Sequence, residues 1–430
     1  MWSRARLHFT PLVSAFLVCG VVGVKVSSPR PARLAVADTL VLANAFVVRP
    51  DTDKPARLAD LVIADGLIVR ILDAPNGAVH RPKSARVLDV GRRYVLPGLV
   101  DAHVHIGGFA AAKRALASGV TTVRSAGVAH FVDVGLRELV ANKTIDGPEF
   151  LAAGYHVQPE PWPTLFLDEP ALADLLQTGI RDSAGIRRVV QAMVSRRVDL
   201  IKVNATARAG LPDTDPREAT FSEDLLKVLV NAASAAGLPV AAHAHGDTGA
   251  RAAVRAGVRS IEHGTYLSDE TLRLMRERGT FLVPTIAIIR DLAEPGGDYD
   301  DAFLLIRGRQ MLPRLRETTR RAYDEGVQIV AATDTGYGNN SQVRMGSELV
   351  EFVQVGLTPR EALRAATATP AELLGLSERT GRIAVGFEAD LIVLDRNPLD
   401  EIEAVNDVLA VFQDGVLVVD RIGLRHMTRR

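Results

Sequence analysis

The sequence lacks the features of a disulfide-bonded, nucleic-acid-binding or membrane-surface protein. It contains one cysteine, Cys19, which excludes an intrachain disulfide and a cysteine-ligated metal cluster. Any metal site must therefore use nitrogen and oxygen ligands. The 51 basic residues balance 51 acidic residues, so a nucleic acid or an anionic membrane surface is not indicated as the main partner. Low-complexity tracts and short internal repeats are also absent.

The N-terminal 37 residues differ from the rest of the chain. Two arginines precede a largely apolar stretch at residues 9–24, and Ala35 and Ala37 are small residues at the positions that a signal peptidase reads. This pattern predicts a signal peptide over residues 1–37 and an exported protein, periplasmic or secreted. The alternative is an anchor that stays in the membrane, although about 16 residues is short for a span. No later segment is apolar enough to cross a bilayer, so we expect no stable span after processing.

Both ends of the remaining chain are rich in short strand-like runs. In residues 38–94 the pair Asp65-Gly66 lies between two apolar runs, and residues 381–430 repeat this pattern at Asp414-Gly415. An Asp-Gly pair between apolar runs is a strong hairpin signal. We therefore expect a small β-sandwich domain built from both chain ends.

Residues 95–380 alternate between strand-like and helical patterns. Eight strand candidates are LVDAHVH, VTTVRSAG, EFLAAGYHV, VDLIKVNA, PVAAHAHG, VRSIEHG, TFLVPTIAI and QIVAATD. Eight strands that alternate with helices predict an α/β fold, a (β/α)₈ TIM-like barrel. The pattern is weakest between residues 157 and 198, where a loop rich in proline and aspartate intervenes.

Capping residues indicate several helix boundaries in this region. Ser222 and Ser268 can each cap a helix that ends at a glycine. Thr358-Pro359 and Thr369-Pro370, each followed by a glutamate, predict capping boxes with proline at the first helical position.

Two histidines end the first barrel-strand candidate, in the stretch VLPGLVDAHVH. His103 and His105 point to the same face, because side chains alternate along a strand. At the C-terminal end of a barrel strand, that face is the mouth of the active site. Two imidazoles held in this way can bind one metal ion, and the alternative is a pair of loop histidines without a ligand role.

Other potential ligands lie at or near the ends of later strand candidates. They are Lys202, His243, His245, His263 and Asp334. Together they place nitrogen and oxygen donors on one rim, which favours zinc, with manganese, cobalt or iron as alternatives.

Lys202 is unusual because it lies inside an apolar strand candidate, DLIKV. A protonated lysine cannot bind a metal, but burial in an electropositive site should lower its pKa and release a neutral amine for reaction. The alternative is an ammonium that pairs with a nearby carboxylate such as Asp199.

The motifs VLPGLVDAHVH, DLIKV, AAHAHG, IEHG and AATDTG, in this order, resemble those of the amidohydrolase superfamily. The most similar branch is the imidazolonepropionase-like group, which includes Xaa-Pro dipeptidases (prolidases) and related carboxypeptidases. The resemblance runs from about residue 40 to residue 420. It includes the end piece GRIAVGFEADLIVLD, which in this family completes the small β domain.

This resemblance implies two divalent metal ions bridged by an N6-carboxylated Lys202 and by a hydroxide. The first ion would be held by His103, His105 and Asp334, and the second by His243 and His263. Asp334 would also orient the hydroxide, take its proton and deliver it to the leaving amine.

Substrate contacts transfer less directly from the family. Related members often carry a Gly-Gly-His run where this chain has AAGYHVQPEPWP. Arg208 and Arg217, after the fourth strand candidate, could bind a substrate carboxylate. The candidates for the pocket or for substrate binding are Tyr155, His156, Arg208, His245 and Tyr266.

The sequence therefore predicts an exported binuclear metal-dependent amidohydrolase. It would cleave an amide C–N bond of a small substrate such as a dipeptide or an N-acyl amino acid. The alternatives are a mononuclear deaminase and an ester or lactone hydrolase on the same scaffold. A non-catalytic binding protein is disfavoured because all six ligand positions are retained, and the sequence is compatible with a homo-oligomer.

Overall fold

The computed structural model describes residues 39–73 and 85–424. The signal peptide expected over residues 1–37 lies outside the described residues. Within the described ranges, no helix combines the length and the apolar character needed to cross a membrane.

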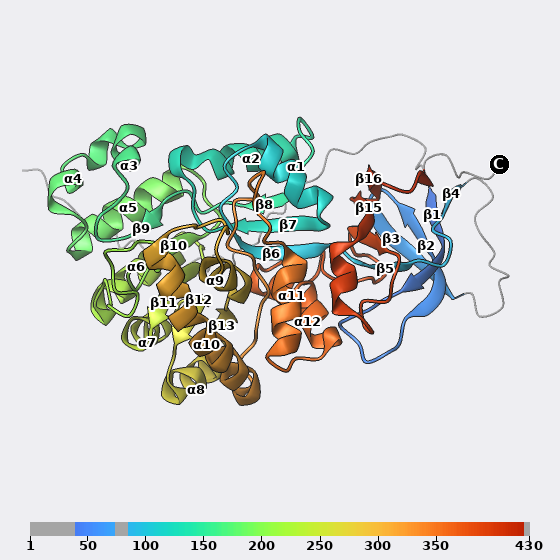
Figure 1. Ribbon diagram of the computed structural model, residues 1–430. Helices are drawn as coiled ribbons and strands as arrows, with labels where there is room; N and C mark the ends of the chain where they lie inside the picture. The colour runs from blue at the N-terminus through green and yellow to red at the C-terminus, as the bar shows by residue number, and fades with distance from the viewer. Residues whose placement is uncertain (1–38, 74–84, 425–430) are drawn as a thin grey trace, which may run out of the picture. The chain divides into compact units, whose positions relative to one another are not determined.

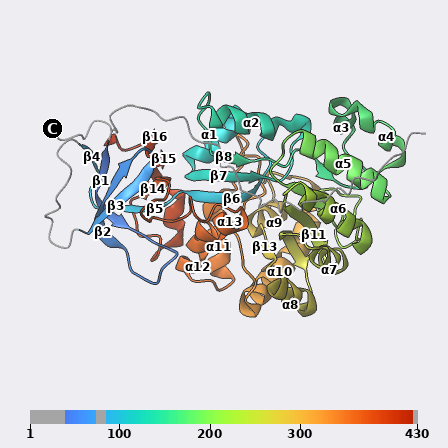
Figure 2. The same ribbon diagram turned by 180° about the vertical axis from the view of Figure 1, so that it is seen from behind.

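Strands from both ends of the described chain meet in one mixed sheet of eight strands, which Figures 1 and 2 show in blue and red. Its order is β16-β15-β14-β5-β1-β2-β3, with β4 paired to β1. The expected sharing of strands between the two ends is present. The sandwich is not confirmed, because these strands are hydrogen-bonded into a single sheet. The strands are β1 (Leu40–Val47), β2 (Arg57–Ala64), β3 (Leu67–Asp73), β4 (Arg86–Asp89), β5 (Tyr94–Pro97), β14 (Leu391–Leu394), β15 (Val408–Gln413) and β16 (Val416–Asp420).

Both predicted hairpins are present in this sheet. The turn at Asp65-Gly66 joins β2 to β3, and the turn at Asp414-Gly415 joins β15 to β16. All four residues have positive φ angles, 52° and 79° in the first turn and 48° and 72° in the second. These values match the type I′ geometry that Asp-Gly favours between antiparallel strands.

The chain passes from this sheet to the parallel strands at Gly98, directly after β5. A Cβ atom at Gly98 would lie 2.2 Å from Oγ1 of Thr121, so only glycine fits here. The close approach places the start of β6, and with it the two histidines that follow, beside β7.

The middle of the chain forms two parallel sheets. The first has the order β6-β7-β8 and the second has the order β13-β12-β11-β10-β9. These strands are β6 (Leu99–Val104), β7 (Val120–Ser125), β8 (Glu149–Leu151), β9 (His156–Val157), β10 (Ile201–Asn204), β11 (Val240–Gly246), β12 (Ser260–Tyr266) and β13 (Phe281–Val283).

The arrangement is α/β and TIM-barrel-like, but residues 95–380 form no closed eight-stranded barrel. The third predicted strand is divided into β8 and β9. Between them, the backbone N–H groups of Ala153 and Gly154 each donate to the Asp133 carboxylate, at 3.0 Å, instead of to a neighbouring strand.

The eighth predicted strand, residues 328–334, is wrong as a regular strand. Isolated parallel bridges are formed by Ile329 with Leu282 on one side and by Thr335, just after the predicted strand, with Val104 on the other. The segment therefore lies between β13 and β6, where the last barrel strand was expected, without forming a continuous ladder.

The seventh predicted strand, residues 280–288, is also too long. Thr285 has a φ angle of 52°, which ends the extended conformation after β13. The Glu348 carboxylate then accepts hydrogen bonds from the N–H groups of Ile286 at 3.0 Å and Ala287 at 2.7 Å. These contacts satisfy amides at the start of a helix, so residues 286–293 become helical.

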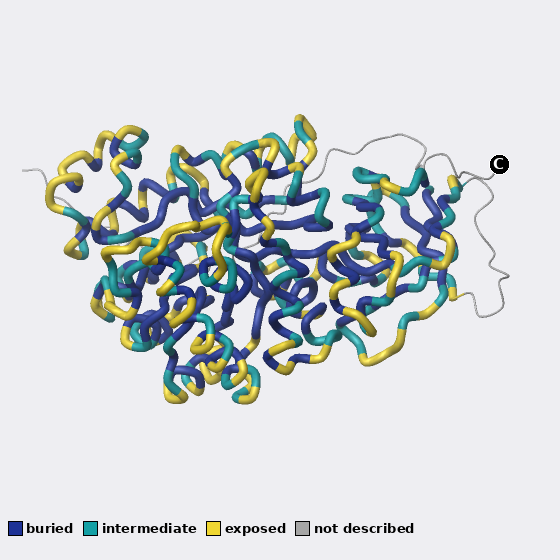
Figure 3. The backbone as a smooth tube through the Cα atoms, viewed as in Figure 1, coloured by how far each residue is buried: buried dark blue, intermediate teal, exposed yellow. Residues whose placement is uncertain are grey.

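Helices connect most of the parallel strands, and their outer faces are exposed while the strands are buried (Figure 3). The α-helices are α1 (Phe109–Ala117), α2 (Val132–Ala141), α3 (Pro163–Asp168), α4 (Leu175–Thr178), α5 (Ser183–Ser195), α6 (Glu223–Ala235), α7 (Asp247–Ala256), α8 (Asp269–Arg278), α9 (Ile286–Ala293), α10 (Ala302–Glu325), α11 (Met345–Gln354), α12 (Pro359–Ala365) and α13 (Ala368–Leu373). Residues 39–73 and 85–424 also contain three short 3₁₀ helices, η1 (Ala129–Phe131), η2 (Pro170–Leu172) and η3 (Ile402–Asn406).

Three of the four predicted caps are confirmed. Ser222 accepts a hydrogen bond from the N–H of Leu225 and Ser268 accepts one from Thr271, while Thr358 forms a capping box. The capping box predicted at Thr369-Pro370 is wrong. Helix α13 already begins at Ala368, so Thr369 lies in its first turn.

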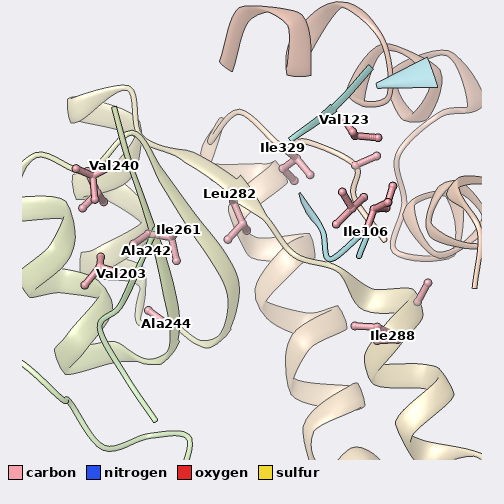
Figure 4. Packing of buried hydrophobic residues seen from close by; sticks show 14 of the residues in the cluster. Ile106, Val123, Val203, Val240, Ala242, Ala244, Ile261, Leu282, Ile288 and Ile329 are labelled. Carbon is pink, nitrogen blue, oxygen red and sulfur yellow. The ribbon is translucent and has the colours of Figure 1, made fainter. Parts of the chain in front are cut away.

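The main core lies between the parallel strands and the surrounding helices. Figure 4 shows side chains from separate strands within it, among them Val203, Ala242, Ile261 and Leu282. This packing holds the strands in a fixed register and so fixes the positions of the side chains at their C-terminal ends.

Candidate metal centre

Two groups of potential metal ligands lie at the C-terminal ends of the parallel strands. In each group the ligand atoms lie within 4.8 Å of one another. The first group contains His103, His105 and Asp334, and the second contains His243, His245 and His263.

The first group is held together by two backbone hydrogen bonds. The N–H of Asp334 donates to the carbonyl of His103 at 2.8 Å, and the N–H of His105 donates to the carbonyl of Thr335 at 3.0 Å. Asp334 Oδ1 consequently lies 3.1 Å from His105 Nε2 and 3.4 Å from His103 Nε2. One carboxylate and two imidazole nitrogens thus converge on a single point.

The second group adjoins the first. The ring centroids of His243 and His263 are 4.7 Å apart, as are those of His245 and His263. His263 also lies near the first group, with Nε2 4.0 Å from Asp334 Oδ2 and its ring centroid 5.2 Å from that of His103. The two groups therefore face one shared space.

Each of the five imidazoles has one ring nitrogen bound to a partner outside the two groups. This leaves the other nitrogen to face the shared space, as second partners do around metal-binding histidines. The pairs are His103 Nδ1 with Glu262, His105 Nδ1 with the Gly127 carbonyl, His243 Nε2 with the Ala207 carbonyl, His245 Nδ1 with Thr265 and His263 Nδ1 with Thr285.

Burial lowers the pKa of His103, His243, His245 and His263 in these groups. The pKa falls to about 4 for His103 and to about 3 for His245. It falls well below its usual range for His243 and His263. These rings are therefore neutral at pH 7, which is the form that binds a metal ion.

Asp334 remains ionised in the same surroundings. Burial alone would raise its pKa, but the neighbouring His103, His105 and Lys202 lower it to about 2. An ionised carboxylate among neutral imidazoles, with no thiolate in the described chain, is a donor set that fits zinc and similar divalent ions.

Lys202 lies on β10 and lines the same pocket as both groups. It is 1% exposed, and its Nζ lies 3.5 Å from His103 Nε2. Burial lowers its pKa to about 8, against the opposing effect of Glu262 and Asp334. The alternative partner, Asp199, instead accepts from Arg137 Nη1 at 2.6 Å, so Lys202 is not held by that carboxylate.

Two functional neighbours were missed in the sequence. Glu262 is fully buried on β12, lies 2.7 Å from His103 Nδ1 and accepts two hydrogen bonds of 2.8 Å from Arg124 on β7. Although burial raises the pKa of Glu262, the Arg124 charge and His103 lower it overall. The signal available in the sequence was a charged residue inside each of two strand-like runs, Arg124 in TTVRS and Glu262 in SIEH.

His263 and Asp334 both adopt left-handed backbone conformations. Their φ angles are 73° and 53°, values that are costly for residues other than glycine. His263 lies within β12, Asp334 lies in the segment that bridges β13 and β6, and both side chains join the site. Such strain is concentrated at functional sites, which agrees with a role for these two side chains.

Asp101 connects β6 to the segment that carries Asp334. Its carboxylate accepts hydrogen bonds from Thr333 N–H at 3.0 Å, Thr333 Oγ1 at 2.6 Å and the Tyr337 hydroxyl at 2.8 Å. It is not a member of either ligand group.

A pocket with an empty volume of about 600 Å³, including space open to solvent, lies over both groups. Of the predicted substrate-binding residues, His156, Arg208 and His245 line this pocket. Tyr155 and Tyr266 are not among the lining residues that the structure describes. The Tyr155 hydroxyl instead donates to Asp168 at 2.5 Å.

The amino-acid sequence of this chain is similar to those of known proteins. The model of the amidohydrolase family matches residues 94–418. An ochratoxinase of Aspergillus niger is 29% identical over 430 residues, covering 89% of this chain and 87% of the relative.

Two solved structures are also similar. A Xaa-Pro dipeptidase with bound methionine has a TM-score of 0.80 and 27% identity, covering 89% of this chain and 100% of that chain. A putative prolidase from Bifidobacterium longum has a TM-score of 0.77 and 29% identity, covering 89% of this chain and 95% of that one.

Proposed function

The chain belongs to the amidohydrolase family, as a hydrolase acting on carbon–nitrogen bonds, and on this premise we propose that it is a binuclear metal-dependent amidohydrolase. Its substrate would be a small molecule with an amide bond, such as a dipeptide or an N-acyl amino acid. The observation that carries this proposal is the pair of ligand groups around one buried lysine.

Six side chains would hold two divalent ions. Zinc fits the donor set best, and manganese, cobalt or iron would also be accepted. Carboxylation of Lys202 would turn its amine into a bridging carbamate between the groups. The first ion would be bound by His103, His105 and Asp334, and the second by His243 and His263.

Bound divalent ions would lower the pKa of a water molecule and polarise the substrate carbonyl. The remaining chemistry belongs to the protein. Asp334 is ionised at neutral pH, so one of its carboxylate oxygens can take the proton of the attacking water and deliver it to the leaving nitrogen. His245 and His156 line the pocket and would orient the substrate.

The names of similar proteins support an amide substrate. They include a Xaa-Pro dipeptidase and an ochratoxinase. The pocket is open to solvent and is lined by both ligand groups, so a small molecule can reach them. Arg208 would bind a carboxylate of that molecule, as its position on the pocket wall suggests.

We further propose that residues 1–37 are a signal peptide and that the mature protein is exported, periplasmic or secreted. An uncleaved N-terminal anchor is the alternative. Residues 38–94 and 381–430 would form the small β domain, and residues 95–380 would form the catalytic one.

The test is to purify the protein with zinc or manganese, count the metal ions and incubate it with a mixed library of dipeptides and N-acyl amino acids. Mass spectrometry would identify the bonds that break. We expect two ions per chain and release of a carboxylate and an amine. One ion per chain with release of ammonia from an aromatic base would instead identify a mononuclear deaminase.

Two variants and a matched control make this test specific. His103→Ala and Lys202→Ala should each lose metal and activity. His130→Ala should retain both, because His130 is a half-exposed histidine paired with Asp168 outside the pocket. Full activity in both site variants would refute the proposed centre.

A further inference from the structure

Arg208 is an arginine in the pocket wall without an anionic partner. Its side chain lines the pocket, and no ion pair or side-chain hydrogen bond of its guanidinium is formed within the described part of the chain. The neighbouring Arg217 differs, because it pairs with Asp215 at 2.7 Å and does not line the pocket. An unpaired guanidinium facing a pocket is suited to bind a carboxylate of the ligand.

The loop that carries Arg208 is fixed in place by Arg307 of α10. The Arg307 guanidinium donates to the backbone carbonyls of Ala209 at 2.7 Å, Pro212 at 3.0 Å and Thr214 at 2.6 Å. Because the loop is held from outside the pocket, Arg208 is positioned before any ligand arrives. Such preorganisation reduces the entropic cost of binding.

One wall of the pocket is apolar. It consists of Ile288, Ile289 and Leu292, all on α9, and Tyr299 also lines the pocket. The start of α9 is fixed by its two hydrogen bonds to the buried Glu348. This wall can accept a branched or aromatic group of the ligand by excluding water from it.

The pocket offers nothing for a free ammonium group. Among the described lining residues, Asp334 is the one carboxylate, and it already lies against His103 and His105. The other ionisable lining groups are histidines, Lys202, Arg208 and Tyr299. A substrate with a free α-amine would therefore bring an unpaired positive charge into an electropositive pocket, which is unfavourable.

We propose that the preferred substrates are N-acylated amino acids with a free carboxylate and a large apolar side chain. This inference rests on the proposed function and narrows its substrate class. Arg208 binds the carboxylate and α9 contacts the apolar side chain. Water adds its hydroxyl to the acyl carbon and its proton to the nitrogen, which breaks the amide bond and releases a carboxylic acid and the free amino acid.

Four compounds test the three parts of this inference on the metal-loaded, full-length protein. N-acetyl-leucine is the reference, glycyl-leucine adds a free amine, N-acetyl-glycine removes the apolar side chain and N-acetyl-leucinamide removes the carboxylate. We expect kcat/KM for N-acetyl-leucine to exceed that of each other compound by about tenfold or more. Equal or better cleavage of glycyl-leucine would overturn the preference for acylated substrates.

Variants assign the preferences to residues. Arg208→Met should lower kcat/KM for N-acetyl-leucine about 10- to 100-fold and leave N-acetyl-leucinamide nearly unchanged. Arg217→Met is the matched control and should change neither. Leu292→Ala should reduce the ratio of kcat/KM for N-acetyl-leucine to kcat/KM for N-acetyl-glycine. Because both values come from the same variant, this ratio does not depend on the fraction of protein that is folded.

The outcomes separate this inference from the proposed function. An equal effect of Arg208→Met on the acid and the amide would overturn the carboxylate contact. Cleavage of amides without these preferences would overturn the inference and leave the proposed function intact. If protein with two ions per chain cleaves no amide at all, the proposed function fails and the inference fails with it.

Discussion

At the residue scale, the two histidines of β11 differ in the nitrogen that remains available. His243 is bound through Nε2 to the carbonyl of Ala207, and His245 is bound through Nδ1 to Thr265. Both lie in the second ligand group, although alternation along the strand had suggested only that they share a face. Geometry alone makes His245 as close to His263 as His243 is, since both ring pairs are 4.7 Å apart.

Separate alanine variants distinguish their roles. We expect His243→Ala to lose one metal ion per chain, because it would remove a direct ligand. His245→Ala should keep two ions and lose mainly kcat, because it would remove a substrate contact. Metal analysis after gel filtration, together with steady-state kinetics, measures both effects. Loss of an ion from His245→Ala but not from His243→Ala would reverse the two assignments.

Glu262 should control the affinity of the first ion through His103. Glu262→Gln removes the negative charge that orients the His103 ring. We expect the affinity for the first metal ion to fall about 10- to 100-fold. The variant also leaves Arg124 buried without its carboxylate, which should destabilise the fold by about 3–5 kcal/mol. Chelator competition measures the first effect and urea unfolding measures the second.

The double variant Arg124→Met/Glu262→Gln separates these two effects. Removing both charges should restore much of the stability, because no buried charge remains unpaired. Metal affinity should stay low, because His103 still lacks its anionic partner. If affinity recovers with stability, Glu262 is important only for folding.

The sequence predicted the side chains that converge in the two groups and missed those that support them. His103, His105 and Asp334 could be found because they stand at strand ends in a recognisable order. Glu262 and Arg124 could not be paired from the sequence, because 138 residues separate them and only the packing of β7 near β12 brings them together. The position of Tyr155 likewise depends on its contact with Asp168, which no local pattern reveals.

At the element scale, the strands with strong apolar patterns were predicted well and those interrupted by local strain were not. The splitting of β8 from β9 depends on Asp133, and the short β13 depends on Thr285 and Glu348. Both effects come from a side chain distant in sequence or from a positive φ angle at a residue other than glycine. Periodicity contains neither kind of information.

Glu348 gives α9 a pH-dependent anchor. Burial raises its pKa from 4.5 to about 8, so the folded state retains a proton that the unfolded state loses above pH 4.5. Stability is therefore greatest at low pH and decreases as the pH rises toward about 8. Glu348→Gln replaces this group with an amide that does not titrate. Its free energy of unfolding should therefore increase relative to that of wild type as the pH rises.

Urea unfolding of both proteins at about pH 5.5 and pH 8 measures this difference. The change should approach about 1 kcal/mol per pH unit within the interval. Glu317→Gln is the matched control, because Glu317 on α10 is largely exposed. A difference between wild type and Glu348→Gln that stays constant with pH would show that Glu348 is ionised in the folded protein.

At the scale of the whole molecule, the ligands connect distant parts of the chain. Helices α1 to α10 all lie between His103 and Asp334 in the sequence, and the two residues meet through a backbone hydrogen bond of 2.8 Å. The sequence predicted the sharing of strands between the chain ends, because both ends carry the same Asp-Gly hairpin pattern. It could not predict that the parallel strands divide into two sheets, which depends on how one segment bridges β13 and β6.

Removal of the metal ions should therefore weaken the fold as well as abolish activity. Ligands that bind only the folded state stabilise it by about 2.7 kcal/mol at 100 times the dissociation constant. We expect dialysis against a chelator to lower Tm by several degrees and zinc to restore it. His103→Ala should show a smaller shift, since its first site is already impaired, and His130→Ala should respond as wild type. An unchanged Tm in protein proven to have lost its ions would show that the two ligand groups are held by packing alone.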